Sequence, residues 1–217
     1  MWGRIAAIAV LAGGLIAAVN NVSDAVPDEQ RAAALSLMHG LKPANGFAGQ
    51  LAFVSAVQDR VLSAAPVDRP IPLGQPRELT DLLKAGHGMC FDRSRAIETV
   101  LRVYGFKARH VSIFSTADTG SALKSLVTPG VDSHVLTEVR TDRGWLLVDP
   151  NRRWIGLTAD GKLSKIDSIA AHKWRSPPAG ILRRPYIYVR GLYSRHGRFY
   201  PPYNPIPDVN WPELVGA

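Results

Sequence analysis

The chain has 217 residues, of which 46% are hydrophobic, and its 26 Lys and Arg residues outnumber its 18 Asp and Glu residues to give a net charge of +8. This length and apolar content are enough for one sizeable hydrophobic core, and no internal repeat or low-complexity tract indicates a second. A single cysteine excludes an intrachain disulfide framework.

The chain begins with a segment that is typical of export. Residues 5–19 form an unbroken apolar run, which is shorter than the ~20 residues needed to span a bilayer and matches the length of a signal-peptide core. Ser23-Asp24-Ala25 offers small residues where a signal peptidase reads, which predicts cleavage before Val26. The alternative is an uncleaved signal-anchor over residues 2–22. In both cases residues 1–25 place the body outside the cytoplasm, in the periplasm or secreted.

Residues 26–76 are predicted to form two helices and a connection. Helical spacing of apolar residues predicts helices at 30–38 and 46–64. Four prolines within residues 66–76 then predict an extended surface connection. A short helix at 77–84 is expected to follow and to begin the main domain, residues 77–172.

The only cysteine lies at the start of a predicted helix. Gly86-His87-Gly88-Met89-Cys90 leads into an apolar pattern that continues to Tyr104 and ends at Gly105. In the first turn of a helix, unpaired N–H groups and the positive end of the dipole favour a thiolate over a thiol. Four charged residues of this helix are expected to face outward: Asp92, Arg93, Arg95 and Arg102.

Three strands are predicted downstream of the helix. The first, residues 108–114, contains His110, which we interpret as a structural histidine without a matched acid. A polar insertion at 115–132, with a short helix at 122–127, is expected to form one wall of the substrate groove. His134 opens the second strand, at 133–140, and the third, at 145–149, ends in Asp149.

A tight turn at 141–144 makes the last two strands an antiparallel pair, which brings His134 and Asp149 side by side. The His134 imidazole could take the proton of Cys90 and later donate it to a leaving amine. Asp149 could hold the ring in the required tautomer and stabilise the imidazolium. The predicted catalytic residues are therefore Cys90, His134 and Asp149.

These segments resemble the transglutaminase-like superfamily of papain-like thiol enzymes. The resemblance rests on Gly88-Met89-Cys90, Gly105-Phe106-Lys107-Ala108-Arg109, Ser133-His134-Val135 and Gly144-Trp145 to Asp149-Pro150, and it covers about residues 77–155. It implies an α+β fold with the nucleophile helix packed on an antiparallel sheet, and it assigns Cys90 as nucleophile, His134 as base and Asp149 as orienting acid. One departure is Val135, where many relatives carry alanine followed by an aromatic residue.

The expected reaction is acyl transfer at an amide bond of a protein or peptide through a thioester. We favour hydrolysis by a peptidase or amidase; transfer to an amine, as in a transglutaminase, remains open because the triad does not select the acceptor. A non-catalytic envelope binding or assembly module with the same fold is a third hypothesis.

Two further residues are candidates for substrate binding. His87 is expected to line the mouth of the cleft, and Gln75 is a candidate for the second oxyanion donor beside the backbone N–H of Cys90. His87 and Cys90 form a His-x-x-Cys spacing, but no second ligand pair accompanies it. We therefore expect neither a metal nor a cofactor.

Residues 173–217 are predicted to form a basic, aromatic and proline-rich extension, after a short helix at 166–172. Residues 173–198 contain seven Lys or Arg and no Asp or Glu. This stretch could contact an anionic envelope polysaccharide or lipid surface, or it could be a solvated face. Residues 199–212 are too proline-rich for a helix or a central strand. No recognition motif for nucleic acid is present.

Overall fold

The computed structural model describes residue 14 and residues 18–171, 173–176, 178–193 and 207–216. Most of the predicted export segment, 1–25, lies outside the described residues, as do the basic positions 195 and 198 and the aromatic stretch 199–205. Within the described part of the chain, no helix has both the length and the apolar character required to cross a membrane.

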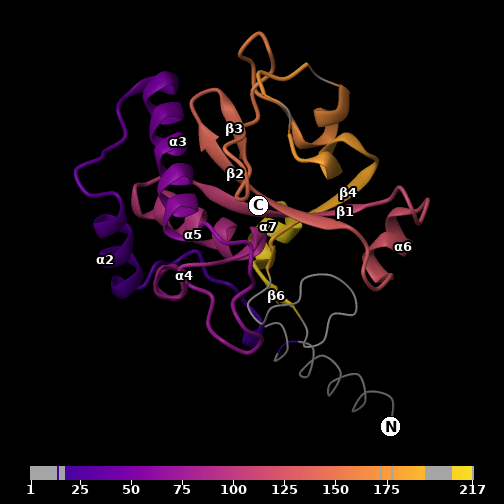
Figure 1. Ribbon diagram of the computed structural model, residues 1–217, viewed down its shortest axis with the longest axis horizontal. Helices are drawn as coiled ribbons and strands as arrows, with labels where there is room; N and C mark the ends of the chain where they lie inside the picture. Colours follow the sequence, from indigo (N-terminus) through magenta and orange to yellow (C-terminus); the bar gives the residue numbers. More distant parts are fainter. Residues whose placement is uncertain (1–13, 15–17, 172, 177, 194–206, 217) are drawn as a thin grey trace.

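A four-stranded antiparallel sheet forms the centre of the molecule, with the strand order β3-β2-β1-β4 (Figure 1). The β2–β3 hairpin is tight: Thr141 pairs with Gly144 and Arg140 with Trp145. Gly144 has a φ of 126°, which a residue with a side chain rarely adopts. The strands are β1 (Ala108–Ser115), β2 (Ser133–Thr141), β3 (Gly144–Val148) and β4 (Tyr186–Arg190).

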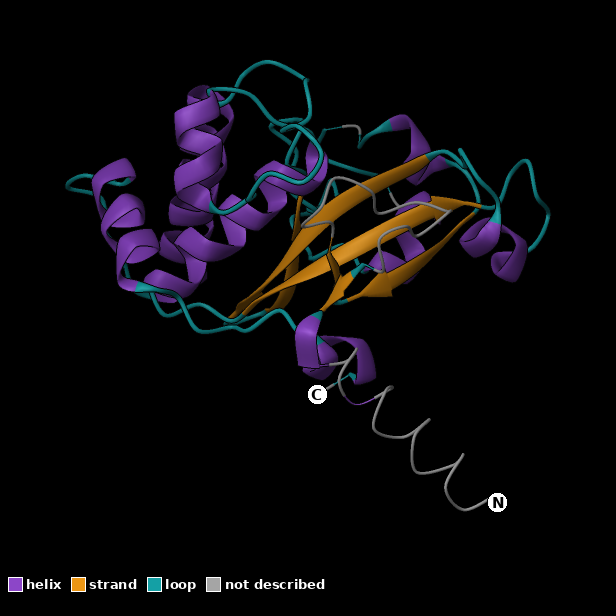
Figure 2. Ribbon diagram, turned by 90° about the horizontal axis from the view of Figure 1, so that it is seen from below, coloured by secondary structure: helices purple, strands orange, loops and turns teal. Residues whose placement is uncertain are grey.

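Four helices gather at one side of this sheet (Figures 1 and 2). Apolar residues of α5 such as Ile97 and Leu101 are fully buried in one cluster with Val139 of β2 and Leu146 of β3. Burying an Ile or Leu side chain stabilises the fold by roughly 1.5–3 kcal/mol, so this cluster fixes α5 against the sheet. The helices are α2 (Asp28–Leu37), α3 (Gly46–Ala64), α4 (Leu79–Ala85) and α5 (Cys90–Val103).

The C-terminal third of the chain covers a second apolar cluster, which includes Leu136 of β2, Leu147 of β3 and the buried Trp154. Because alternate residues of a strand point to opposite faces, Leu136 and Val139 belong to different clusters on the two faces of the sheet. The remaining elements are α6 (Ala122–Val127), η1 (Ile166–Ala171), η2 (Gly180–Arg183), β5 (Leu192–Tyr193), β6 (Asp208–Val209) and α7 (Trp211–Val215).

The predicted α+β fold, with the helix that begins at Cys90 packed on an antiparallel sheet, is confirmed. The short helix predicted at 166–172 is a 3-10 helix over its described part. One local prediction was wrong: residues 199–212 were expected to be too proline-rich for a helix, yet 211–215 form the helix α7. Pro212 lies in its first turn, where the missing N–H removes no helical hydrogen bond.

The outward orientation predicted for the charged residues of α5 was also wrong. Asp92 and Arg93 are each 1% exposed, and the Arg102 side chain is 9% exposed. The helix is enclosed by α2, α3, α4 and the sheet, so that charged side chains have neighbours on every side. Each of the three is compensated by an ion pair.

Candidate functional site

The start of α5 holds Cys90 in a fixed backbone position. Asp92, two residues further on, accepts the backbone N–H of Met89 at 2.9 Å and forms a buried ion pair with Arg77. Gly88 approaches so closely that an added Cβ would lie 2.6 Å from Leu82. Cys90 itself is 6% exposed, and as the first helical residue its N–H has no partner within the helix.

Arg93 joins this helix to the loop after β3. Its guanidinium donates to the carboxylate of Asp68 at 2.6 Å and to the side-chain oxygen of Asn151 at 2.7 Å, while Nε donates to the carbonyl of Ala65 at 2.8 Å. Arg93 lies three residues after Cys90, and Asn151 lies two residues after Asp149. The buried guanidinium therefore ties the segment that carries the thiol to the segment that carries the carboxylate.

His134 and Asp149 lie next to each other at one end of the β2–β3 hairpin. His134 is the second residue of β2, and Asp149 follows the last residue of β3. His134 is 6% exposed and Asp149 is fully buried. Nε2 of His134 lies 3.2 Å from Oδ1 of Asp149, at ion-pair distance although without the alignment of a hydrogen bond.

The Asp149 carboxylate is held by its own loop. Oδ1 accepts the backbone N–H groups of Asn151 at 2.8 Å and Arg152 at 3.2 Å. Oδ2 is buried and has no hydrogen-bond partner in the described chain, so it can receive the Nε2–H of His134 after a small rotation of either side chain.

The environment of His134 favours its cationic form. Burial alone would lower the pKa of the imidazole, but its contacts with the Asp149 carboxylate and the Cys90 sulfur outweigh burial and raise the pKa from 6.5 to about 10. The Cys90 side chain is one of these contacts. The structure thus brings all three residues of the predicted triad together.

A glutamine on a separate helix supports the acid loop. Nε2 of Gln58, which is 3% exposed in α3, lies 2.8–2.9 Å from the carbonyl oxygens of Asp149, Arg152 and Trp154. Its two hydrogens cannot satisfy three acceptors at full strength, so they share them. Sequence reasoning missed Gln58 because only the fold reveals that α3 faces this loop.

The other predicted site residues have separate surroundings. His87 is half-buried, and its Nδ1 lies 2.9 Å from the carbonyl oxygen of Arg69 in the proline-rich connection. Gln75 is exposed in a turn, where its N–H donates to the carbonyl of Pro72 at 3.2 Å. The described contacts link neither residue to the triad. Among the described residues, no cluster of His, Cys, Asp and Glu could hold a metal ion.

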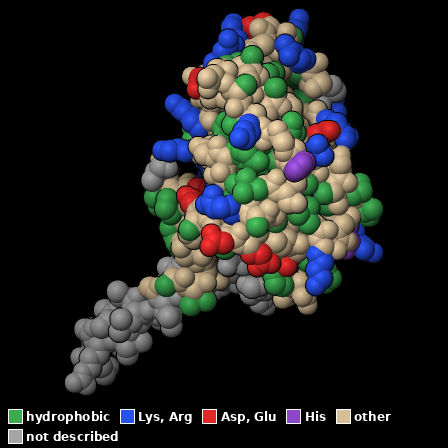
Figure 3. Space-filling view, turned by 90° about the vertical axis from the view of Figure 1, so that its left-hand side faces the viewer, with side chains coloured by type: hydrophobic (Ala, Val, Ile, Leu, Met, Phe, Trp, Pro, Cys, Tyr) green, Lys and Arg blue, Asp and Glu red, His purple; other side chains and the backbone are tan. Residues whose placement is uncertain are grey.

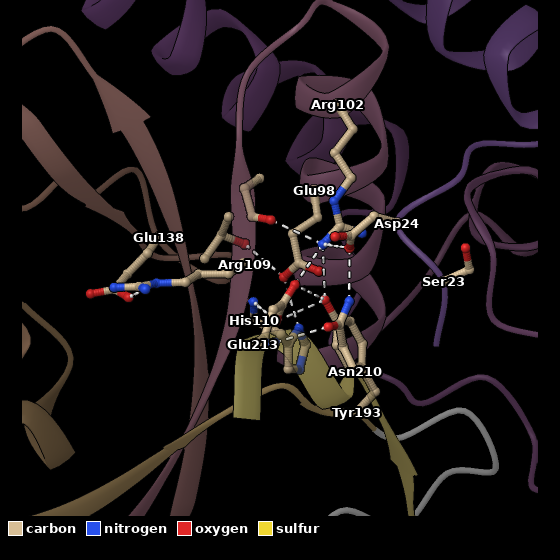
Figure 4. A network of polar contacts seen from close by, with 12 residues as sticks. Ser23, Asp24, Glu98, Arg102, Arg109, His110, Glu138, Tyr193, Asn210 and Glu213 are labelled. Carbon is tan, nitrogen blue, oxygen red and sulfur yellow. Dashed lines mark hydrogen bonds and ion pairs between the residues drawn. The ribbon is translucent and has the colours of Figure 1, made fainter. Parts of the chain in front are cut away.

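His110 has an acidic partner, contrary to the prediction. Its Nδ1 lies 2.8 Å from Oε1 of Glu98, and that oxygen also accepts the hydroxyl of Ser94 at 2.9 Å. Figure 4 shows His110 and Glu98 within a larger polar cluster that includes Arg102 and Glu213. His110 is 1% exposed and Glu98 fully buried, so this serine, histidine and carboxylate set is closed to any substrate.

A family model described as "Transglutaminase-like superfamily" matches residues 43–150, the segment that carries all three triad residues. No curated protein matches the chain. Among solved structures, the periplasmic domain of TgpA from Pseudomonas aeruginosa is 22% identical and has a TM-score of 0.42; the match covers 62% of this chain and 46% of that one.

A Parabacteroides distasonis protein whose description proposes a protease is 12% identical, also with a TM-score of 0.42, over 56% of this chain and 23% of that one. The match therefore spans less than half of the length of either solved chain.

Proposed function

Because the chain belongs to the transglutaminase-like superfamily, a family of the thiol-enzyme type, we propose that it is a thiol enzyme that transfers acyl groups from amide bonds through a thioester on Cys90. The observation that carries this proposal is the contact of one buried imidazole, His134, with both Cys90 and Asp149. The raised pKa of His134 keeps the ring charged at neutral pH, which supports a thiolate on its neighbour.

In the acylation step, Sγ of Cys90 attacks the carbonyl carbon of an amide. The backbone N–H of Cys90 at the start of α5 stabilises the oxyanion that forms. The proton that left the thiol resides on His134, which donates it to the departing amine as the C–N bond breaks. A thioester and a free amine result.

In the second step, an acceptor attacks the thioester carbonyl and transfers its proton to His134, and the C–S bond breaks to release the thiolate of Cys90 beside the imidazolium. Water as acceptor gives a carboxylic acid, and this peptidase or amidase reaction is the one we propose. Supporting it, the described domain is small and has little chain beyond the core from which to build a dry amine-binding tunnel.

The acceptor is tested by incubating the purified protein with casein, with and without a primary-amine probe. Hydrolysis predicts casein fragments whose amount the probe does not change, and their loss in Cys90→Ala. Incorporation of the amine without fragments would establish a transglutaminase instead. If neither product forms while Cys90 reacts as an ordinary thiol, the chain is a binding module.

Export completes the proposal. Residues 5–19 have the length of a signal-peptide core, and the described body begins directly after it. The enzyme would then act on protein or peptide substrates outside the cytoplasm. Immunoblotting of cell fractions tests this: the proposal expects the protein in the extracytoplasmic or membrane fraction and is contradicted by recovery in the cytoplasm alone.

A further inference from the structure

A basic pocket lies at the far end of the sheet from the triad. Its volume is about 320 Å³, and it lies beside the β2–β3 turn, whereas His134 is at the opposite end of β2. Arg140 follows His134 by six residues, which is roughly 20 Å along a strand. On the face shown in Figure 3, by contrast, Lys and Arg side chains are scattered among other residues.

The floor of this pocket is an ion-pair cluster with surplus positive charge. Arg109 of β1 and Arg190 of β4 bind the same carboxylate, Glu138 of β2, at 2.6 and 2.9 Å. The Glu138 side chain is 4% exposed, and the side chains of Arg109 and Arg190 are 15% and 25% exposed. Figure 4 shows Arg109 reaching toward Glu138 and away from the cluster around Glu213. One carboxylate neutralises only one of the two cations.

Further cations line the walls. Arg140, Arg143 and Lys165 line the pocket, and no ion pair is found for them among the described residues. The Arg143 guanidinium lies over the Phe47 ring of α3, 4.5 Å from its centre. The only other carboxylate in the lining, Asp167, accepts the hydroxyl of Tyr188. Five basic and two acidic residues line the pocket, and five minus two leaves a net charge of +3.

Trp145 fixes the geometry of these cations. The Arg109 guanidinium lies 3.8 Å from the centre of its ring, and that of Arg140 lies 5.8 Å away. Two arginines therefore lie against the indole, which leaves less of its ring for stacking with a neutral sugar or base. Held guanidinium groups are suited instead to bidentate binding of an oxyanion.

We infer that this pocket binds a phosphate-bearing ligand. A phosphate group carries about −1.5 to −2 charges at neutral pH and three acceptor oxygens, which complements a +3 pocket better than one carboxylate would. An adjoining cavity of about 730 Å³ shares Arg109, Arg140 and Trp145, so a ligand larger than one phosphate fits. This cavity adds two basic residues, Arg102 and Lys107, and two acidic ones, Asp24 and Glu213, so the surplus positive charge stays in the smaller pocket. The same chemistry could come from a soluble phosphorylated molecule or from a phospholipid headgroup.

Titration calorimetry of the full chain with pyrophosphate, at constant ionic strength, tests the inference. Arg140→Gln and Lys165→Gln should each weaken binding about tenfold, the loss expected for one charge-assisted hydrogen bond, without unfolding the protein because neither side chain has an ion-pair partner in the described chain. Arg31→Gln, an exposed arginine in α2, removes the same charge elsewhere and should bind like the wild type. Succinate should bind more weakly than pyrophosphate.

Sedimentation with vesicles identifies the source. Phosphatidylcholine vesicles with and without phosphatidylglycerol are compared, because the apolar run at residues 5–19 is expected to bind both kinds. A lipid headgroup is indicated if the wild type binds the anionic vesicles more strongly than the neutral ones and Arg140→Gln abolishes this difference. A soluble ligand is indicated if the protein binds pyrophosphate but shows no such preference for anionic vesicles. The inference is overturned if pyrophosphate and anionic vesicles both fail to bind selectively, if Arg140→Gln and Lys165→Gln bind like Arg31→Gln, or if succinate binds as tightly as pyrophosphate.

Discussion

At the scale of single residues, the chain contains two histidine and carboxylate pairs that differ in their access to a substrate. His134 with Asp149 lies at strand ends beside the first residue of α5, whereas His110 with Glu98 lies in the middle of a strand and of a helix. Helix starts have unpaired N–H groups, and strand ends meet loops, so the first location suits chemistry. Mid-helix and mid-strand positions suit a buried structural network.

The protonation of His134 is a direct prediction at this scale. Its pKa of about 10 lies above the ordinary value, so the ring is expected to stay cationic from acid to about pH 9 and to lose its proton near pH 10. Nuclear magnetic resonance of nitrogen-15-labelled histidine measures this titration. Cys90→Ala should lower the midpoint, since the sulfur is one of the groups that raise the pKa. A midpoint at or below 6.5 in the wild type would disprove the assignment.

That Cys90, His134 and Asp149 lie close together could be predicted from the sequence, because each lies at the edge of a recognisable element. Cys90 follows a glycine and starts an apolar helical pattern, and His134 and Asp149 end two strands of one hairpin. Arg93 could not be found in this way. A charged residue in a helical pattern is normally assigned to the solvent face, and only the packing of α3 and the acid loop around α5 shows that Arg93 is enclosed.

At the scale of elements, α3 does more than cover the core. Val54, Val57 and Val61 bury one face of the helix, and Gln58 on the same helix supplies hydrogen bonds to the loop that carries Asp149. The loop has no regular backbone pairing of its own beyond Asp149 N–H to the carbonyl of Trp154. Gln58 is therefore a positioning residue for the acid.

Replacing Gln58 tests this role. Gln58→Leu would leave buried carbonyls of the acid loop unpaired, which costs about 1–3 kcal/mol of unfolding free energy in urea titrations. Catalytic turnover on casein should fall as well, because Asp149 would lose its fixed position. The matched control is Gln50→Leu on the same helix. The half-buried Gln50 side chain bonds Asp142, outside the acid loop, so its loss should leave both quantities nearly unchanged. Equal effects of the two substitutions would argue against a positioning role.

An element could be predicted well when the residues that determine it lie within its own segment of the sequence. The bounds of α3 and α6 agree with the expected 46–64 and 122–127, since glycine or serine and apolar spacing mark them locally. The connection at 66–76 was expected at the surface, yet Ile71 is buried and its carbonyl accepts from Arg77. That contact depends on the distant Asp92 carboxylate, which no local pattern contains.

At the scale of the whole molecule, a buried polar cluster joins both ends of the described chain to α5. Arg102 of α5 forms ion pairs with Asp24 at 3.0 Å and with Glu213 of α7 at 2.7 Å, and Asn210 donates to Asp24 at 2.8 Å (Figure 4). Asp24 and Glu213 thus share one arginine, and the Glu98 carboxylate is close enough to Glu213 to act on its charge. Two nearby carboxylates with too few cations cannot both ionise at low cost.

Burial, together with the charge of Glu98, raises the pKa of Glu213 to about 8. At neutral pH the folded state therefore holds a proton that the unfolded state has released, and stability is expected to fall as the pH rises from 4.5 to about 8. Glu213→Gln should remove this fall, so that the variant gains stability relative to the wild type over that range in urea unfolding. Glu29→Gln, an exposed carboxyl in α2, should show no such gain. If Glu213→Gln loses as much stability as the wild type when the pH rises from 4.5 to about 8, Glu213 is already ionised in the folded state and the prediction is wrong.

The central claim, that Cys90 is a thiolate paired with His134, is tested most directly by alkylation with iodoacetamide across pH. Because Cys90 is the only cysteine, labelling reports this residue alone. We predict that the wild type is labelled rapidly at pH 6. His134→Ala, checked for folding by circular dichroism, should be labelled rapidly only near pH 8.5, about where an ordinary thiol ionises. If folded wild type and His134→Ala label with the same ordinary pH dependence, the pair does not exist and the proposed chemistry fails.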